Sequence, residues 1–209
     1  MWKTPILDFF FPKFCLNCNK EGEYLCQDCF ALIDILKTQP DPFLYCAALY
    51  DNFVVKKLIN QFKYEPYIKE LAEPLSFLII AHLLNLEKFP DFRDFVLAPV
   101  PLYKKKLKQR GFNQAEELAK ELAKFLKIPI ISDALLKIKN TPAQVELKKE
   151  QRQENIKGSF FCQKPEIIRG RKILLVDDIY TTGATMEECK KCLAEAGANV
   201  VLGICVARG

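Results

Sequence analysis

The stretch VDDIYTTGAT, residues 176–185, restricts the possible folds of this chain more than any other part of the sequence. An apolar run over 173–176 ends in two adjacent carboxylates, Asp177 and Asp178, and a turn of threonines and glycine follows. A helical pattern then covers 185–196. A short apolar run that passes through such a turn into a helix predicts a strand–turn–helix unit of an α/β protein.

Strand-like and helix-like segments alternate from residue 41 onward. Strand patterns occupy 44–50, 95–100, 128–131, 173–176 and 200–206, and helical patterns occupy 54–62, 67–86, 113–127 and 185–196. The segment 113–127 is the most regular helical pattern, because apolar residues recur in it at i, i+3, i+4 and i+7. This order of segments predicts an α/β fold in which helices flank a parallel sheet.

Four of the nine cysteines form two C-x2-C pairs that are separated by seven residues: Cys15, Cys18, Cys26 and Cys29. Two such pairs can surround one ion with four thiolates, which suits structural zinc, with iron as a second metal. Two disulfides or a redox pair are the alternatives. We favour zinc and expect two domains, a zinc-binding module over 1–40 and an α/β domain over 41–209.

The other five cysteines and the single histidine are expected to pack in the interior or on the surface: Cys46, Cys162, Cys189, Cys192, Cys205 and His82. No apolar run reaches the roughly 18 residues that a membrane-spanning helix needs. The N-terminus has no small-residue cleavage site that would indicate a signal peptide. We therefore expect a cytoplasmic protein.

Asp177, Asp178 and the turn after them predict a ligand site. Open α/β sheets bind ligands beyond the carboxyl ends of their strands, and helix N-termini attract phosphate. The hydroxyls of Thr181, Thr182 and Thr185 add donors. Carboxylates repel a phosphate but suit ribose hydroxyls or a bridging magnesium ion. The pattern predicts a sugar phosphate, and an acidic helix cap before a plain turn is the alternative.

A basic segment accounts for the whole net charge of +5, through five residues: Lys104, Lys105, Lys106, Lys108 and Arg110. These residues could neutralise a pyrophosphate. They could also bind the backbone of a nucleic acid, with Tyr103 and Phe112 as faces for base stacking. A solvated lysine run is the third interpretation. Lys63, Tyr64 and Arg152 are weaker candidates for the same roles.

Several motifs carry a family resemblance. ILLVDDIYTTGAT resembles the phosphoribosyl-pyrophosphate signature of the type I phosphoribosyltransferases. The motifs APVPL (98–102), RGFNQAEELA (110–119), TPAQ (141–144) and QRQENIKGSF (151–160) follow the four-cysteine segment in that order. Together they resemble the ComF family of competence-associated proteins over nearly the whole chain. The resemblance implies a type I phosphoribosyltransferase-like sheet with a small N-terminal zinc module.

The resemblance also implies where phosphoribosyl pyrophosphate and its Mg²⁺ bind. The ribose hydroxyls would lie on Asp177 and Asp178, and the 5′-phosphate on a turn of five residues: Thr181, Thr182, Gly183, Ala184 and Thr185. A pyrophosphate loop would comprise Val100, Pro101, Leu102, Tyr103 and Lys104. A flexible hood loop would span about 140–158.

The function implied is natural transformation, with handling of incoming single-stranded DNA in the cytoplasm or at the inner face of the membrane. A competence helicase or another DNA-processing protein would be a partner, and some relatives use imported DNA as a carbon source. The first alternative is an active phosphoribosyltransferase on an unknown acceptor. Purine-using relatives carry an Asp where Thr181 stands, which argues against purine salvage. The second alternative is an adaptor whose sugar-phosphate site has decayed.

Overall fold

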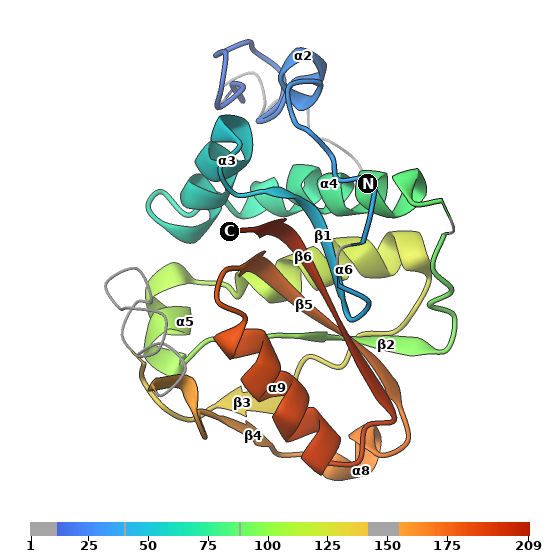
Figure 1. Ribbon diagram of the computed structural model, residues 1–209. Helices are drawn as coiled ribbons and strands as arrows, with labels where there is room; N and C mark the ends of the chain where they lie inside the picture. The colour runs from blue at the N-terminus through green and yellow to red at the C-terminus, as the bar shows by residue number, and fades with distance from the viewer. Residues whose placement is uncertain (1–11, 40, 88, 142–154) are drawn as a thin grey trace.

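The structure is a computed structural model that describes residues 12–39, 41–87, 89–141 and 155–209. A four-stranded sheet lies at its centre (Figure 1) and has the strand order β1-β6-β5-β2. Its strands are β1 (Leu44–Leu49), β2 (Phe95–Pro99), β5 (Lys172–Tyr180) and β6 (Val200–Arg208). All neighbouring strands run parallel, which confirms the predicted α/β fold.

Helices cover both faces of the sheet. One face packs against α3 (Phe53–Lys63), α4 (Ala72–Asn85) and α6 (Gln114–Leu126). The other face packs against α9 (Ala184–Glu195) and a two-stranded antiparallel sheet of β3 (Leu135–Lys137) and β4 (Phe160–Cys162). Short helices are α2 (Gln27–Phe30), α5 (Lys104–Arg110) and α8 (Pro165–Ile168), and a 3-10 turn, η1 (Lys69–Leu71), precedes α4.

The two faces of the sheet belong to separate hydrophobic cores. On β5, Leu174 and Val176 join the core under α4 and α6, whereas Ile173 and Leu175 join the core under α9. This division follows from the alternation of side chains along a strand. Consecutive residues of β5 therefore point to opposite sides of the sheet.

Some boundaries differ from the expectation. The helix expected over 67–86 begins only at Ala72, after η1, and Pro74 fits in its first turn because a backbone N–H there has no partner to lose. The strand expected over 128–131 is a single bridge from Ile130 to Leu97. The strand expected to end at Val176 continues to Tyr180, because β6 extends to Arg208 and pairs with it.

The described part of the four-cysteine segment packs directly on α4. The Phe30 and Phe77 rings meet edge to face with centroids 6.4 Å apart, and Cys15 and Ile33 belong to the same core as α4.

His82 is fully buried, as expected, and its Nδ1 lies 2.6 Å from the Leu36 carbonyl oxygen. The division into two domains at residue 40 stays a prediction.

Candidate functional site

The two acids of the signature lie on β5 beyond the last β2 pair, Pro99 with Val176. Asp177 points toward the α9 face, where Lys137 and Cys189 are its electrostatic neighbours. Asp178 points to the opposite face, toward α3. The backbone N–H of Asp178 donates to Asp177 Oδ1 at 2.8 Å. The acids therefore occupy the carboxyl edge of the sheet but present their carboxylates to different sides.

Asp178 is paired with Lys63, the last residue of α3. Lys63 Nζ lies 2.8 Å from Asp178 Oδ1, and the Asp178 side chain is only 6% exposed. Burial favours the neutral amine of Lys63, but the attraction of Asp178 and Asp177 outweighs it and raises the lysine pKa. Lys63, a weaker candidate from the sequence, is therefore part of the site.

Asp177 keeps its proton to an unusually high pH. Burial and the repulsion of Asp178 raise its pKa to about 7, and the nearby charges of Lys63 and Lys137 offset only part of this effect. The Asp177 carboxyl is therefore protonated over a wider pH range than an ordinary aspartate. A titratable group of this kind in a ligand site is typical of functional residues.

Four cations from three elements lie at this end of the sheet. Lys63 of α3 and Lys137 of β3 act electrostatically on Asp177, and Lys106 and Arg110 of α5 lie within electrostatic range of Lys63. Burial and the charge of Lys106 lower the pKa of Lys137 to about 8. Burial, Arg110 and Lys63 lower the pKa of Lys106. Such mutual repulsion means that the four charges, named the cation cluster below, lie close together. Four cations against two acids favour an anionic ligand.

The turn after β5 contains a glycine in a conformation that other residues rarely adopt. Gly183 has φ of 78°, a left-handed conformation, directly before α9. A Cβ at this position would lie 2.4 Å from the Tyr180 hydroxyl, so a larger residue would also require the Tyr180 ring to shift. The Ala184 N–H donates to Thr182 Oγ1 at 3.5 Å, and Thr181 is exposed. The role of Thr181, Thr182, Gly183, Ala184 and Thr185 in phosphate binding stays a prediction.

The RGFNQ motif forms the corner between α5 and α6. Gly111, with φ of 79°, ends α5, and the Asn113 side chain begins α6 by accepting from Ala115 N at 3.2 Å. Asn113 Nδ2 donates to the Val100 carbonyl at 3.0 Å. This bond fixes the first residue of the expected pyrophosphate loop.

Gln114 connects the same corner to α3. Its Nε2 donates to the Phe62 carbonyl at 2.9 Å, and its Oε1 accepts from Arg110 Nη1 at 2.9 Å. Phe112 is only 8% exposed and packs on Phe62, with ring centroids 5.6 Å apart. The expectation that Phe112 offers a stacking face is therefore wrong, because its ring lies in the core.

The expected pyrophosphate loop is a loop only in part. Residues 100–103 join β2 to α5, but Lys104 is the first residue of α5. Lys106 Nζ donates to the Thr141 carbonyl at 3.2 Å, so α5 lies against the start of the expected hood. Most of the hood, including Arg152, lies outside the described residues.

Two parts of the site could not be predicted from the sequence. Lys137 lies on a three-residue strand whose pattern is too short to recognise, and no other signal in the sequence indicates it. The sequence also did not indicate which residues of α5 face the interior, because the basic segment has no apolar period.

The four cysteines near the N-terminus form one cluster. Their Sγ atoms all lie within 4.8 Å of one another, and all but Cys18 are buried. The Asn17 amide donates to Cys29 Sγ at 3.2 Å, which suits a thiolate. Four sulfurs at this spacing fit a closed, structural zinc site.

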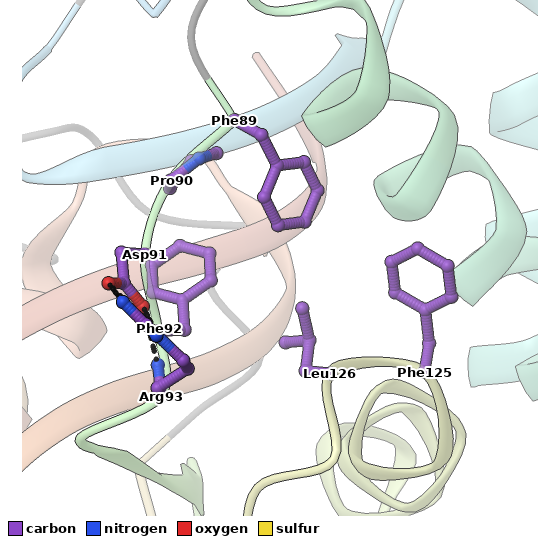
Figure 2. Close-up of a pocket in the computed structure, with 7 residues that line it drawn as sticks. All are labelled: Phe89, Pro90, Asp91, Phe92, Arg93, Phe125 and Leu126. Carbon is purple, nitrogen blue, oxygen red and sulfur yellow. Dashed lines mark hydrogen bonds and ion pairs between the residues drawn. The ribbon is translucent and has the colours of Figure 1, made fainter.

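A pocket at the opposite edge of the sheet lies between the residues before β2 and the end of α6 (Figure 2). It measures about 380 Å³ and is lined by Phe89, Pro90, Asp91, Phe92, Arg93, Phe125 and Leu126. Among its described lining residues the charged ones are Asp91 and Arg93, which pair with each other at 2.6 Å. These residues therefore offer a phosphate no free cation.

Among the described residues, none of the helices combines the length and apolarity that crossing a membrane requires.

The chain is similar to several known proteins. The phosphoribosyl transferase domain family matches residues 107–209. Competence protein F of Haemophilus influenzae is 29% identical over 195 residues, which cover 90% of this chain and 81% of that protein. Competence protein ComFC of Bacillus subtilis is 27% identical over 199 residues, 88% of this chain and 79% of that protein. DNA utilization protein YhgH of Escherichia coli is 31% identical over 153 residues, 72% of this chain and 66% of that protein.

With its four-cysteine cluster, the chain therefore belongs to the ComF family of the type I phosphoribosyltransferase superfamily.

Proposed function

We propose that this chain acts in natural transformation or DNA utilisation, where it handles incoming single-stranded DNA and binds phosphoribosyl pyrophosphate. The names of its relatives support the biological role. The observation that carries the proposed binding of phosphoribosyl pyrophosphate is the combination of three features: the cation cluster, Asp177 and the glycine turn before α9. This combination offers positive charge for phosphates and a carboxyl group for hydroxyls at the carboxyl edge of the sheet.

Each part of the ligand has a suitable group. Backbone N–H groups and hydroxyls at the start of α9 would hold the 5′-phosphate, as helix N-termini do. Lys106 and Lys137 would bind the pyrophosphate, and Asp177 would accept from a ribose hydroxyl. Mg²⁺, when bound, would bridge pyrophosphate oxygens and neutralise part of their charge. In this proposal Asp178 does not bind the ligand directly, because its carboxylate is already paired with Lys63.

The test is calorimetric titration of phosphoribosyl pyrophosphate with Mg²⁺ into the metal-loaded protein. Wild type should bind, and Lys137→Met should bind at least tenfold more weakly, because a charge-assisted hydrogen bond contributes about 1.5–3 kcal/mol. Lys191→Met, a change at an exposed lysine on α9, is the control. Failure of wild type to bind would overturn the sugar-phosphate part and favour the DNA adaptor.

One observation favours the alternative of a working phosphoribosyltransferase. A carboxyl with a pKa of about 7 is well matched to general-base work at neutral pH. Release of pyrophosphate from phosphoribosyl pyrophosphate in the presence of candidate acceptors tests it. Dependence of that release on Asp177 would support turnover, and its absence with every acceptor would favour binding alone.

A further inference from the structure

The basic helix α5 has two chemically different faces. Lys106 and Arg110, spaced i and i+4, are half-buried and lie on the same side of the helix. Lys104, Lys105 and Lys108 are exposed. The five cations that dominate the net charge are therefore not one continuous patch.

The inward face of α5 belongs to the sugar-phosphate site. Lys106 lies within electrostatic range of Lys63 and Lys137, and it donates to Thr141. Arg110 is held by Gln114 at 2.9 Å and lies within range of Lys63. Both side chains are thus turned toward Lys63 and are partly shielded from solvent.

The outward face of α5 has no partner of this kind. Within the described part of the chain, no carboxylate pairs with Lys104, Lys105 or Lys108. Gln109 Nε2 reaches the Tyr67 hydroxyl at 3.3 Å and so connects this surface to the loop after α3. In that loop Tyr64 is 47% exposed. Lysines without a carboxylate partner on α5, together with an exposed tyrosine in the loop that contacts α5, suit a single-stranded nucleic acid, which offers phosphates and stacking bases.

We propose that α5 separates two ligands that bind at the same time: the sugar phosphate on its inward face and single-stranded DNA on its outward face. This inference rests on the proposed function and adds that the two sites do not overlap. Lys104, Lys105 and Lys108 contact DNA phosphates, Tyr64 stacks on a base, and Lys106 and Arg110 take no part in DNA binding.

The experiment uses the full chain and two probes, a fluorescent oligothymidylate and phosphoribosyl pyrophosphate with Mg²⁺. The outward variant is Lys104→Gln/Lys105→Gln/Lys108→Gln, which keeps the helix propensity of α5. The inward variant is Lys106→Gln, and the charge-matched control is Lys37→Gln/Lys57→Gln/Lys191→Gln at exposed sites elsewhere.

The outward variant should lose DNA affinity at least tenfold and keep sugar-phosphate affinity. Its plot of log K against log salt should become shallower by about 2, because each lost phosphate contact on a single strand contributes about 0.7. The inward variant should show the reverse, and saturating sugar phosphate should leave the oligonucleotide bound to wild type.

Displacement of the oligonucleotide by the sugar phosphate, or parallel loss of both affinities in the outward variant, would overturn the separation while the proposed function stands. Equal loss of DNA affinity in the control would overturn the outward face as the DNA site. Wild type that binds no oligonucleotide would contradict both the inference and the DNA part of the proposed function.

Discussion

Lys63 Nζ and Asp178 Oδ1 lie 2.8 Å apart, although 115 residues separate them in the sequence. This pair joins the end of α3 to β5 beside the signature. It also leaves Asp177 as the signature acid with no lysine within hydrogen-bonding distance among the described residues.

Lys63→Met should destabilise the fold, because the buried carboxylate of Asp178 loses its counter-ion. We expect a cost of about 3 kcal/mol, the lower end for a buried pair, since the Lys63 side chain is 25% exposed. Urea denaturation measures the loss, and Lys191→Met should change stability by less than about 1 kcal/mol. The double variant Lys63→Met/Asp178→Asn should recover much of the loss. Equal stability of wild type and Lys63→Met would show that the pair contributes nothing.

The raised pKa of Asp177 predicts a pH-dependent stability. Below the unfolded pKa of 3.8 the group is protonated in both states and costs nothing. As pH rises toward about 7, the unfolded chain loses the proton first, so stability falls by up to about 1.4 kcal/mol per pH unit. The cost is constant above that pH. Denaturation at several pH values should show this fall in wild type and a flatter profile in Asp177→Asn. Parallel profiles of the two proteins would exclude the raised pKa.

Disruption of the four-cysteine cluster should affect the whole domain, because Cys15, Cys26 and Cys29 belong to the same core as α4. Cys26→Ser should lose bound zinc and lower Tm by roughly 6–12 °C, the shift for about 3 kcal/mol in a chain of this size. Metal analysis and calorimetry test both effects. Cys162→Ser, outside the cluster and half-buried, should keep its zinc. Wild-type protein without metal would point to a disulfide or redox role.

Gly183→Ala should damage the turn before α9 in two ways, by its left-handed φ and by the contact with the Tyr180 hydroxyl. We expect a loss of about 1–2 kcal/mol together with weaker sugar-phosphate binding. Gly170→Ala is the matched control, because its φ is similar at 73° but its Cβ would meet nothing within 4 Å. If both variants bind the ligand like wild type, the close approach at Gly183 is irrelevant to binding.

The sequence predicted the elements whose signals are local. Helix α6 was expected over 113–127, and the structure has Gln114–Leu126 with Asn113 and Lys127 as its caps. The cap and the apolar period lie within the same segment, so neighbouring residues suffice to define it. The four cysteines were equally clear, because their spacing alone predicts the cluster.

The parts that were missed depend on contacts between distant segments. Lys137 enters the site only because β3 pairs with β4, across a segment of more than twenty residues. Phe112 resembled an exposed stacking residue because basic residues precede it, yet the ring of Phe62 covers it. The direction in which each α5 lysine points likewise depends on the orientation that the RGFNQ corner gives to α5. Hydrophobic periodicity cannot predict such features, because α5 contains a single apolar residue, Leu107, and one residue defines no period.

Gln114 gives that corner a mechanical role. Its amide group is held at both ends, by Arg110 of α5 and by the Phe62 carbonyl directly before Lys63. A shift of α5 therefore strains the hydrogen bonds that hold the end of α3, and the next residue along the backbone, Lys63, is the one that pairs with Asp178. Whatever coupling this line transmits between the two faces of α5 must be reciprocal, because linkage requires each ligand to change the affinity of the other by the same factor.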